Sequence, residues 1–432
     1  MRRGVYILLF LILPIGLITW LIFSGSNIIE RQPVVASTTN TKPANNATTG
    51  KVVEQGAVTS YTPEQVKAII KETNPTYTGP TPALKTQTFR YTMNDTSGKT
   101  VNVYARAYVQ SDLPTSGQTP IFAFAPGTTG IDDQCAASTE VPAKRNFANY
   151  ASHMAAYAAQ GYAVVITDYE GMRDPDRIHH YMVGVLEGRA VLDSARALRN
   201  LSLTKNTADT SQIFVAGYSQ GGHAAYWADK IAGTYAPELE IKGVIGFGPV
   251  TDVRQTLTDV TRGANILWFG PYLLYSYSDW YKETYPLDLI LMPPYSKNLS
   301  TDIAKNCIDT NITYWGNKDI NRVYTKDFID AMRTGSVASV APSFDARMVE
   351  NLTANTKTSS RKLINHGKLD NVVLPSQSDA AVKRLCSLGS PVSYRQYPDA
   401  THYNTMLKSF NDTLNWMKAV RTGGTTSSEC KR

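Results

Sequence analysis

Short apolar segments that alternate with helical stretches constrain the fold of this chain more than any other feature. From residue 120 onward these segments are too continuously apolar to be strands with one face in water. Buried strands separated by helices indicate a mostly parallel sheet with helices on both faces, so the predicted fold class is α/β. The predicted strands are Ile121–Ala125, Tyr162–Thr167, Ile213–Ala216, Ile241–Phe247, Lys362–Ile364 and Val392–Gln396, and the helices are about Phe147–Gln160, Leu186–Leu198, Gln220–Ala232 and Met406–Val420.

A helix and a β-hairpin are predicted ahead of this alternation. Thr62-Pro63-Glu64-Gln65 has a capping threonine, proline at the first helical position and glutamine three residues after the cap, which predicts a helix start. Two alternating segments, Thr86–Met93 and Thr100–Val109, are joined by a polar stretch that ends in glycine and form the predicted hairpin.

The alternation stops between Pro249 and Lys362, which predicts an inserted cap. We expect the cap to span 250–361 and to separate two parts of one core, 61–249 and 362–432. Tryptophan, tyrosine, phenylalanine and leucine crowd residues 268–281 within it. Two interpretations stay open: these side chains form a core for the cap itself, or some of them line an apolar acyl pocket.

The N-terminal segment is typical of an exported protein. Arg2 and Arg3 precede an uncharged apolar run, Val5–Phe23, and this pattern fits both a cleaved signal peptide and an uncleaved membrane anchor over 1–23. Residues 24–60 hold mostly Ser, Thr, Asn, Pro and Gly, which predicts a flexible linker. Outside the cytoplasm the four cysteines, Cys135, Cys307, Cys386 and Cys430, are expected to form two disulfides, with three pairings open.

Composition argues against several functional classes. The 432 residues are 42% hydrophobic and 18% charged, which is too apolar for a disordered chain and too mixed for a protein with many membrane spans. The net charge of +7 includes no run of five basic residues, so nucleic-acid binding is not expected. No cysteines lie at CxxC spacing and His179-His180 is interpreted as a loop pair, so we predict no metal and no other cofactor.

The chemistry is expected at Gly217-Tyr218-Ser219-Gln220-Gly221. This G-x-S-x-G follows an apolar strand and opens a helical stretch, as a nucleophile elbow requires. In such an elbow the serine oxygen stands clear of the sheet, next to a helix N-terminus that favours a developing negative charge. Ser219 is therefore the predicted nucleophile.

A serine nucleophile needs a base and an acid, which follow it along the chain in enzymes that carry this elbow. His223 lies one turn into the following helix and His366 precedes the acid, so His402, in a loop before the last helix, is the predicted base. Asp370, just past the strand Lys362–Ile364, is the predicted acid, and Asp399 is the alternative.

The oxyanion is expected to contact two backbone N–H groups. Gln220, directly after the nucleophile, supplies one of them. The other is expected from the loop Pro126-Gly127-Thr128-Thr129-Gly130, with either Thr128 or Thr129 as the donor.

These motifs together resemble the secretory lipase family of bacteria and fungi. Beside the elbow, the oxyanion loop, Asp370 and His402, the resemblance rests on Gly161-Tyr162 through Thr167-Asp168-Tyr169-Glu170-Gly171 and on Glu187-Gly188-Arg189-Ala190-Val191-Leu192-Asp193, and it covers about residues 60–430. It implies an α/β-hydrolase fold with an inserted lid and the disulfides Cys135–Cys307 and Cys386–Cys430. Pro126 departs from the histidine that many relatives carry there, so the donor residue in this loop stays open.

The resemblance also implies hydrolysis of glycerol esters of fatty acids by Ser219, Asp370 and His402. The predicted function is an exported lipase or esterase that acts on lipid or other ester substrates and contacts a lipid interface. Two alternatives stay open: a serine peptidase for short peptides on the same fold, and a non-catalytic binding module.

Overall fold

The computed structural model describes residues 48–114, 118–141, 148–205, 207–316 and 318–430. The predicted signal peptide or anchor and the linker up to residue 47 lie outside these ranges. Within the ranges, no helix is both long and apolar enough to cross a membrane.

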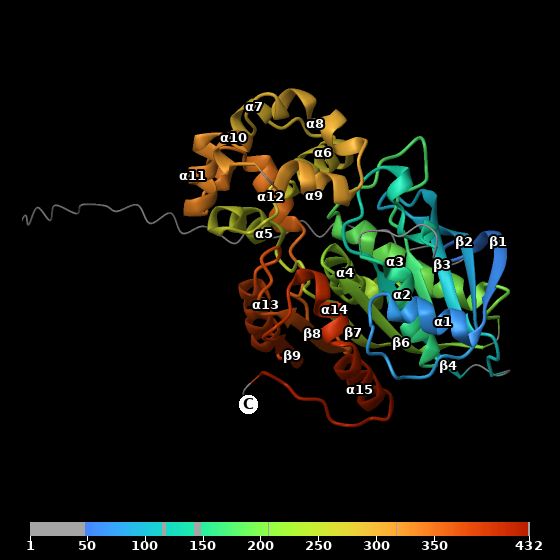
Figure 1. Ribbon diagram of the computed structural model, residues 1–432. Coiled ribbons are helices and arrows are strands. Elements are labelled where there is room, and N and C mark those ends of the chain that lie inside the picture. Colours follow the sequence, from blue (N-terminus) through green and yellow to red (C-terminus); the bar gives the residue numbers. More distant parts are fainter. Residues whose placement is uncertain (1–47, 115–117, 142–147, 206, 317, 431–432) are drawn as a thin grey trace, which may run out of the picture. The chain divides into compact units, whose positions relative to one another are not determined.

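Nine strands of the described residues form one sheet in the order β1-β2-β3-β5-β4-β6-β7-β8-β9 (Figure 1). The first four in this order pair antiparallel and the remaining pairs are parallel, which confirms the predicted α/β class and the predicted hairpin, β2–β3. Carboxyl ends of parallel strands meet at one edge of a sheet, so the loops after β4, β6, β7, β8 and β9 converge. The strands are β1 (Val52–Tyr61), β2 (Leu84–Asn94), β3 (Thr100–Gln110), β4 (Thr119–Ala125), β5 (Ala163–Thr167), β6 (Ala208–Tyr218), β7 (Ile241–Phe247), β8 (Arg361–Gly367) and β9 (Val392–Tyr397).

Both faces of the sheet are buried under helices. Along β4, Ile121 and Ala123 belong to one apolar cluster, whereas Phe122 and Phe124 belong to the other. Helices α3 and α4 contribute to the first cluster, and α1, α2 and α15 to the second. This explains why the strand sequences are continuously apolar. The helices are α1 (Pro63–Lys71), α2 (Tyr150–Ala159), α3 (Gly184–Asn200), α4 (Gln220–Tyr235), α13 (Pro375–Ser387), α14 (Thr405–Lys408) and α15 (Phe410–Arg421).

The predicted linker is wrong at its C-terminal end. Residues 52–61 form β1, an edge strand that pairs with β2 from Val52↔Tyr91 to Tyr61↔Leu84. Most of its side chains are exposed, so its stability comes from backbone hydrogen bonds and needs little apolar content. The composition that suggested a linker is therefore also that of a solvated edge strand. The predicted capping box at Thr62 is present at the start of α1.

The segment between β7 and β8 is mostly helical, and we call its helices α5 to α12 the cap helices. Figure 1 shows them grouped together. Tyr272, Leu273, Leu274 and Tyr277 are fully buried in the same apolar cluster as α3 and α4. The predicted limits of the cap, residues 250 and 361, stay predictions, because the apolar cluster runs from the core into the cap helices without marking a boundary. The cap helices are α5 (Val253–Asp259), α6 (Phe269–Tyr281), α7 (Leu287–Ile290), α8 (Tyr295–Ala304), α9 (Ile308–Gly316), α10 (Ile320–Val323), α11 (Lys326–Thr334) and α12 (Pro342–Glu350).

Candidate active site

Ser219 occupies a strained turn between β6 and α4. Its backbone angles are φ 54° and ψ −115°, a region that non-glycine residues rarely adopt. A Cβ added at Gly217 would lie 1.9 Å from the Gly221 carbonyl oxygen, and one added at Gly221 would lie 1.9 Å from the Ala125 carbonyl oxygen. The two flanking glycines therefore allow strand and helix to approach closely enough to form the elbow.

His402 and Asp370 form a close pair at the same edge of the sheet. The Nδ1 atom of His402 lies 2.7 Å from Oδ2 of Asp370, and both side chains are buried. Asp370 Oδ1 accepts hydrogen bonds from the backbone N–H groups of Val372 and Val373, each at 2.9 Å. Burial alone raises the pKa of Asp370, but the neighbouring His402 and His366 hold it well below its usual range. Asp370 is therefore ionised and fixes the ring of His402.

His366 supports Asp370 from the other side. Its Nε2 donates to the Val373 carbonyl oxygen at 2.9 Å and lies 3.2 Å from Asp370 Oδ2. A carbonyl oxygen only accepts, so Nε2 carries the proton and Nδ1 accepts from the Ser378 hydroxyl at 2.7 Å. The sequence excluded His366 as the base but gave no sign of this supporting contact.

Ser219 and His402 line one small cavity of about 30 Å³. Both the core and the cap contribute to its wall. Of the cap aromatics, Trp268 lines the cavity, whereas Tyr272 and Tyr277 are fully buried in the apolar cluster. The rest of the wall is Thr128, Ala148, Tyr150, Tyr218, Asn265, Ile308, Ile312, Val372 and Tyr403.

The structure separates the two candidate oxyanion residues of the loop after β4. Thr128 lines the cavity, whereas Thr129 is buried and its carbonyl oxygen accepts from the Ile308 N–H at 2.8 Å. Gln220 is the first residue of α4, where a backbone N–H has no acceptor within the helix. Thr128 thus lines the same cavity as Ser219, and Gln220 directly follows Ser219 along the chain.

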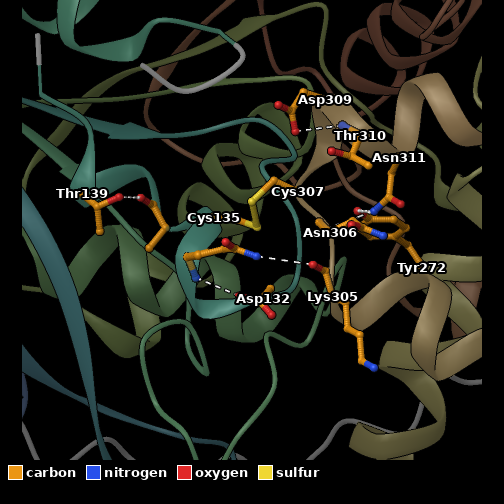
Figure 2. The surroundings of a disulfide bond; sticks show 12 residues. Asp132, Cys135, Thr139, Tyr272, Lys305, Asn306, Cys307, Asp309, Thr310 and Asn311 are labelled. Carbon is orange, nitrogen blue, oxygen red and sulfur yellow. Dashed lines mark hydrogen bonds between the residues drawn. A yellow bond between two sulfur atoms is a disulfide. The ribbon is translucent and has the colours of Figure 1, made fainter. Parts of the chain in front are cut away.

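Two disulfides pair the cysteines as the family resemblance implies. Cys135–Cys307 joins the segment after the oxyanion loop to the start of α9, and Cys386–Cys430 joins α13 to the C-terminal segment. Figure 2 shows the first of them. The side chain of Gln134, next to Cys135 along the chain, donates a hydrogen bond to the Lys305 carbonyl oxygen at 3.4 Å. The loop that carries Thr128 is therefore covalently attached to the cap helices.

The other candidates lie away from His402 or serve as hydrogen-bonding partners. Asp399, the alternative acid, is exposed and pairs with Lys408. His180 lies between two carboxylates: its Nδ1 is 2.6 Å from Glu170 Oε2, and its Nε2 is 2.9 Å from Asp279 Oδ2. The described residues contain no group of three or more metal-ligating side chains.

Tyr150 is a site residue that the sequence reasoning missed. It is the first residue of α2, it lines the cavity, and its hydroxyl oxygen accepts a hydrogen bond from the Gly127 N–H at 2.7 Å. A tyrosine 22 residues beyond Thr128 carries no local motif that would have marked it.

Comparison with known proteins identifies the family. The family model described as "Secretory lipase" matches residues 150–429, well over half of the chain. Lipase A of Moesziomyces aphidis is 38% identical over 104 residues, which are 24% of this chain and 21% of that protein. The trichothecene C-3 esterase of Fusarium sporotrichioides is 23% identical over 297 residues, 66% of this chain and 63% of the relative. The matched parts thus span less than two thirds of either relative.

Solved structures show the same fold. The rice cell wall degrading esterase LipA of Xanthomonas oryzae superposes with a TM-score of 0.70 at 18% identity, over 86% of this chain and 97% of that one. Together with the parallel sheet and the elbow, this assigns the α/β-hydrolase fold. The chain belongs to the secretory lipase family.

Proposed function

We propose that the protein is a serine hydrolase that cleaves carboxylic esters through Ser219, His402 and Asp370. The observation that carries this proposal is the 2.7 Å contact of His402 with Asp370, beside a cavity that His402 shares with the strained Ser219. The proposed nucleophile, base and orienting acid would thus come from three loops at one edge of the sheet and supply the three roles that acyl transfer needs.

The proposed reaction has two steps. His402 Nε2 takes the proton of the Ser219 hydroxyl as its oxygen attacks the ester carbonyl, and the backbone N–H groups of Gln220 and Thr128 bind the oxyanion. His402 then gives the proton to the leaving alcohol. Water then attacks the acyl-enzyme and gives a proton to His402. His402 returns this proton to the Ser219 oxygen as the acid leaves, which restores the serine hydroxyl.

Acylglycerols are the proposed natural substrate. The cavity wall combines Trp268, Ile308, Ile312 and aromatic residues of the core, which suits an apolar acyl group. Relatives include a lipase and an esterase by name, and neither name alone decides the chain length. The cap helices would cover this substrate, and the linkage of Cys135 to Cys307 keeps cap and oxyanion loop together.

Export is proposed as well. The family description is that of secreted proteins, and two disulfides fit an oxidising compartment. Residues 1–23 would act as a signal peptide or as an anchor.

The test is hydrolysis of p-nitrophenyl esters from acetate to palmitate by the full chain, by Ser219→Ala and by Ser387→Ala. Ser387 is an exposed serine on α13 and serves as the control. We expect Ser219→Ala to lose at least about 10³-fold in kcat and Ser387→Ala to match the wild type. The chain length with the highest kcat/KM separates lipase from esterase. Hydrolysis of every ester that persists in Ser219→Ala would refute the serine mechanism, and turnover of peptides alone would support the peptidase alternative.

A further inference from the structure

Four buried polar side chains form a hydrogen-bonded chain that begins at the elbow. They are Gln220, His179, Glu187 and His223, none of them more than 1% exposed. The proposed proton transfer between Ser219 and His402 uses none of them. Buried polar groups are costly unless they are fully paired, so a chain of four next to a reactive serine calls for a role.

The side chain of Gln220 is held at both of its amide hydrogens. Its Nε2 donates to Glu187 Oε1 at 2.7 Å and to His179 Nε2 at 2.8 Å. Because His179 Nε2 accepts, the proton of this ring is on Nδ1, which faces the Glu170 carbonyl oxygen at 3.4 Å. Burial lowers the pKa of His179 to about 4, in keeping with a neutral ring.

Glu187 is the centre of this chain. Its Oε1 also accepts from the Met182 N–H at 3.0 Å, and its Oε2 lies 2.7 Å from His223 Nδ1. The other ring nitrogen of His223, Nε2, lies 2.8 Å from the Asn351 carbonyl oxygen and 3.1 Å from the Trp227 indole nitrogen. Asn351 directly follows α12, the last cap helix, and its Oδ1 accepts from the Gly184 N–H at the start of α3.

Of the first three residues of α4, Gln220 alone carries a side chain. The two residues after it, Gly221 and Gly222, are glycines, because a Cβ at either would collide with Ala125 or Pro249. The elbow therefore requires a turn almost without side chains, and such a turn has few contacts that hold its peptide planes. An oxyanion donor is effective only when its N–H points at the place where charge develops.

We propose that Glu187 is a positioning residue that holds the Gln220 backbone N–H toward the oxyanion, and that His223 connects this support to Asn351 at the end of the cap helices. The inference rests on the proposed function, since it assigns the oxyanion contact to Gln220. Glu187 itself touches no reacting atom.

The test compares the full chain with Glu187→Gln on an ester and on its thionoester, in which sulfur replaces the carbonyl oxygen. Sulfur accepts hydrogen bonds poorly, so thionoester turnover depends little on the oxyanion donors. In Glu187→Gln an amide N–H₂ or a weaker acceptor replaces the carboxylate. We expect kcat on the ester to fall about 10- to 100-fold with KM within about twofold, and kcat on the thionoester to fall much less.

Asp229→Asn is the matched control. Asp229 is a buried carboxylate on the same helix that accepts from Thr358 and Ser360 and has no contact with Gln220. If Asp229→Asn lowers kcat, it should do so by the same factor on the ester and on the thionoester. The double variant Glu187→Gln with Gln220→Glu again places a hydrogen-bond donor opposite an acceptor. We expect it to recover part of the ratio of kcat on the ester to kcat on the thionoester.

Equal losses on the two substrates, or no loss, in Glu187→Gln would overturn the inference. If that variant fails to fold, Gln220→Met removes the same hydrogen bond from the Gln220 side and leaves the pair of Glu187 and His223 in place. The ratio of kcat on the ester to kcat on the thionoester is then measured in that variant. Failure of the proposed function looks different: the wild type itself then shows no ester turnover that depends on Ser219.

Discussion

The carboxylate of Asp370 receives hydrogen bonds at both oxygens, from Val372 and Val373 at one and from His402 at the other, which also lies 3.2 Å from His366 Nε2. This arrangement leaves the ring of His402 with its proton on Nδ1 and its free lone pair on Nε2, the form that a base for Ser219 requires. The charge and the position of this one side chain therefore decide which ring nitrogen of the proposed base carries the proton.

Asp370→Asn should lower kcat by about 10³- to 10⁴-fold with little change in fold. An asparagine that keeps its carbonyl oxygen on Val372 and Val373 turns its N–H₂ toward His402 Nδ1. The ring then carries its proton on Nε2 and cannot accept the one from Ser219. Steady-state kinetics on p-nitrophenyl butyrate measure the loss. Asp399→Asn, at the exposed alternative acid, should retain full activity, and a large loss in that variant would contradict the assignment.

Gly248→Ala should disturb the hydrogen-bonded pair of Asp370 and His402. Gly248 follows β7 with a φ of 50°, and an added Cβ would lie 3.1 Å from Asp370 Oδ2 and 3.2 Å from His402 Nδ1. Gly335, with a φ of 71° and open space around it, is the control, because alanine there pays only the backbone cost of about 1–2 kcal/mol. We expect both variants to lose stability in urea unfolding and Gly248→Ala alone to lose kcat. Unchanged activity in Gly248→Ala would contradict the close approach.

At the scale of elements, most predictions came from two features of the sequence: continuously apolar segments and the order of the motifs along the chain. The strands around the elbow were predictable because both of their faces are buried, and Asp370 and His402 because they lie in loops that follow β8 and β9. The edge strand β1 was not predictable in this way, because a strand with most of its side chains exposed has no continuous apolar run. The contacts of Glu187 and Tyr150 join residues 33 and 23 positions apart, and no local pattern encodes them.

The two disulfides should differ in their effect on activity. Cys135→Ser with Cys307→Ser removes the covalent link between the oxyanion loop and α9 and leaves the hydrogen bond from the Ile308 N–H to the Thr129 carbonyl oxygen. Cys386→Ser with Cys430→Ser removes only the link between the C-terminal segment and α13. Loop entropy gives stability losses of about 5 and about 4 kcal/mol for the two pairs, so both variants should melt earlier. At a temperature where both are folded by circular dichroism, we expect kcat to fall in the first and to stay near the wild-type value in the second. Equal kcat values would show that the loop keeps its position without the link.

At the scale of the whole molecule, one buried histidine makes stability depend on acid. His153 is buried on α2, a helix that contributes to the second apolar cluster, and burial lowers its pKa to about 4. An unfolded histidine has a pKa near 6.5. The stability that comes from the neutral ring is complete above about pH 6.5 and is lost as the pH falls toward 4, because only the unfolded chain then gains a proton.

His153→Leu should therefore flatten the pH dependence of unfolding. Between pH 7.5 and pH 4.5 the wild type should lose about 2.5 kcal/mol relative to this variant. Urea unfolding of both proteins at the two pH values measures the difference. A wild-type-to-variant difference that stays constant across this range would show that His153 is protonated in the folded protein at pH 4.5.

The anchoring of Asn351 also restricts the hosts in which this protein can fold. Its side-chain N–H₂ donates to the Tyr281 hydroxyl and to the Arg347 carbonyl oxygen, and Asn351-Leu352-Thr353 is an acceptor sequence for N-linked glycans. A sugar on that nitrogen would remove a hydrogen that these contacts use and would have no room, because Asn351 is 2% exposed. A secretory pathway that glycosylates nascent chains would therefore work against folding at the junction of cap and core. Thr353→Val would remove the acceptor sequence before production in such a host, at a buried hydroxyl that makes no hydrogen bond with the described residues.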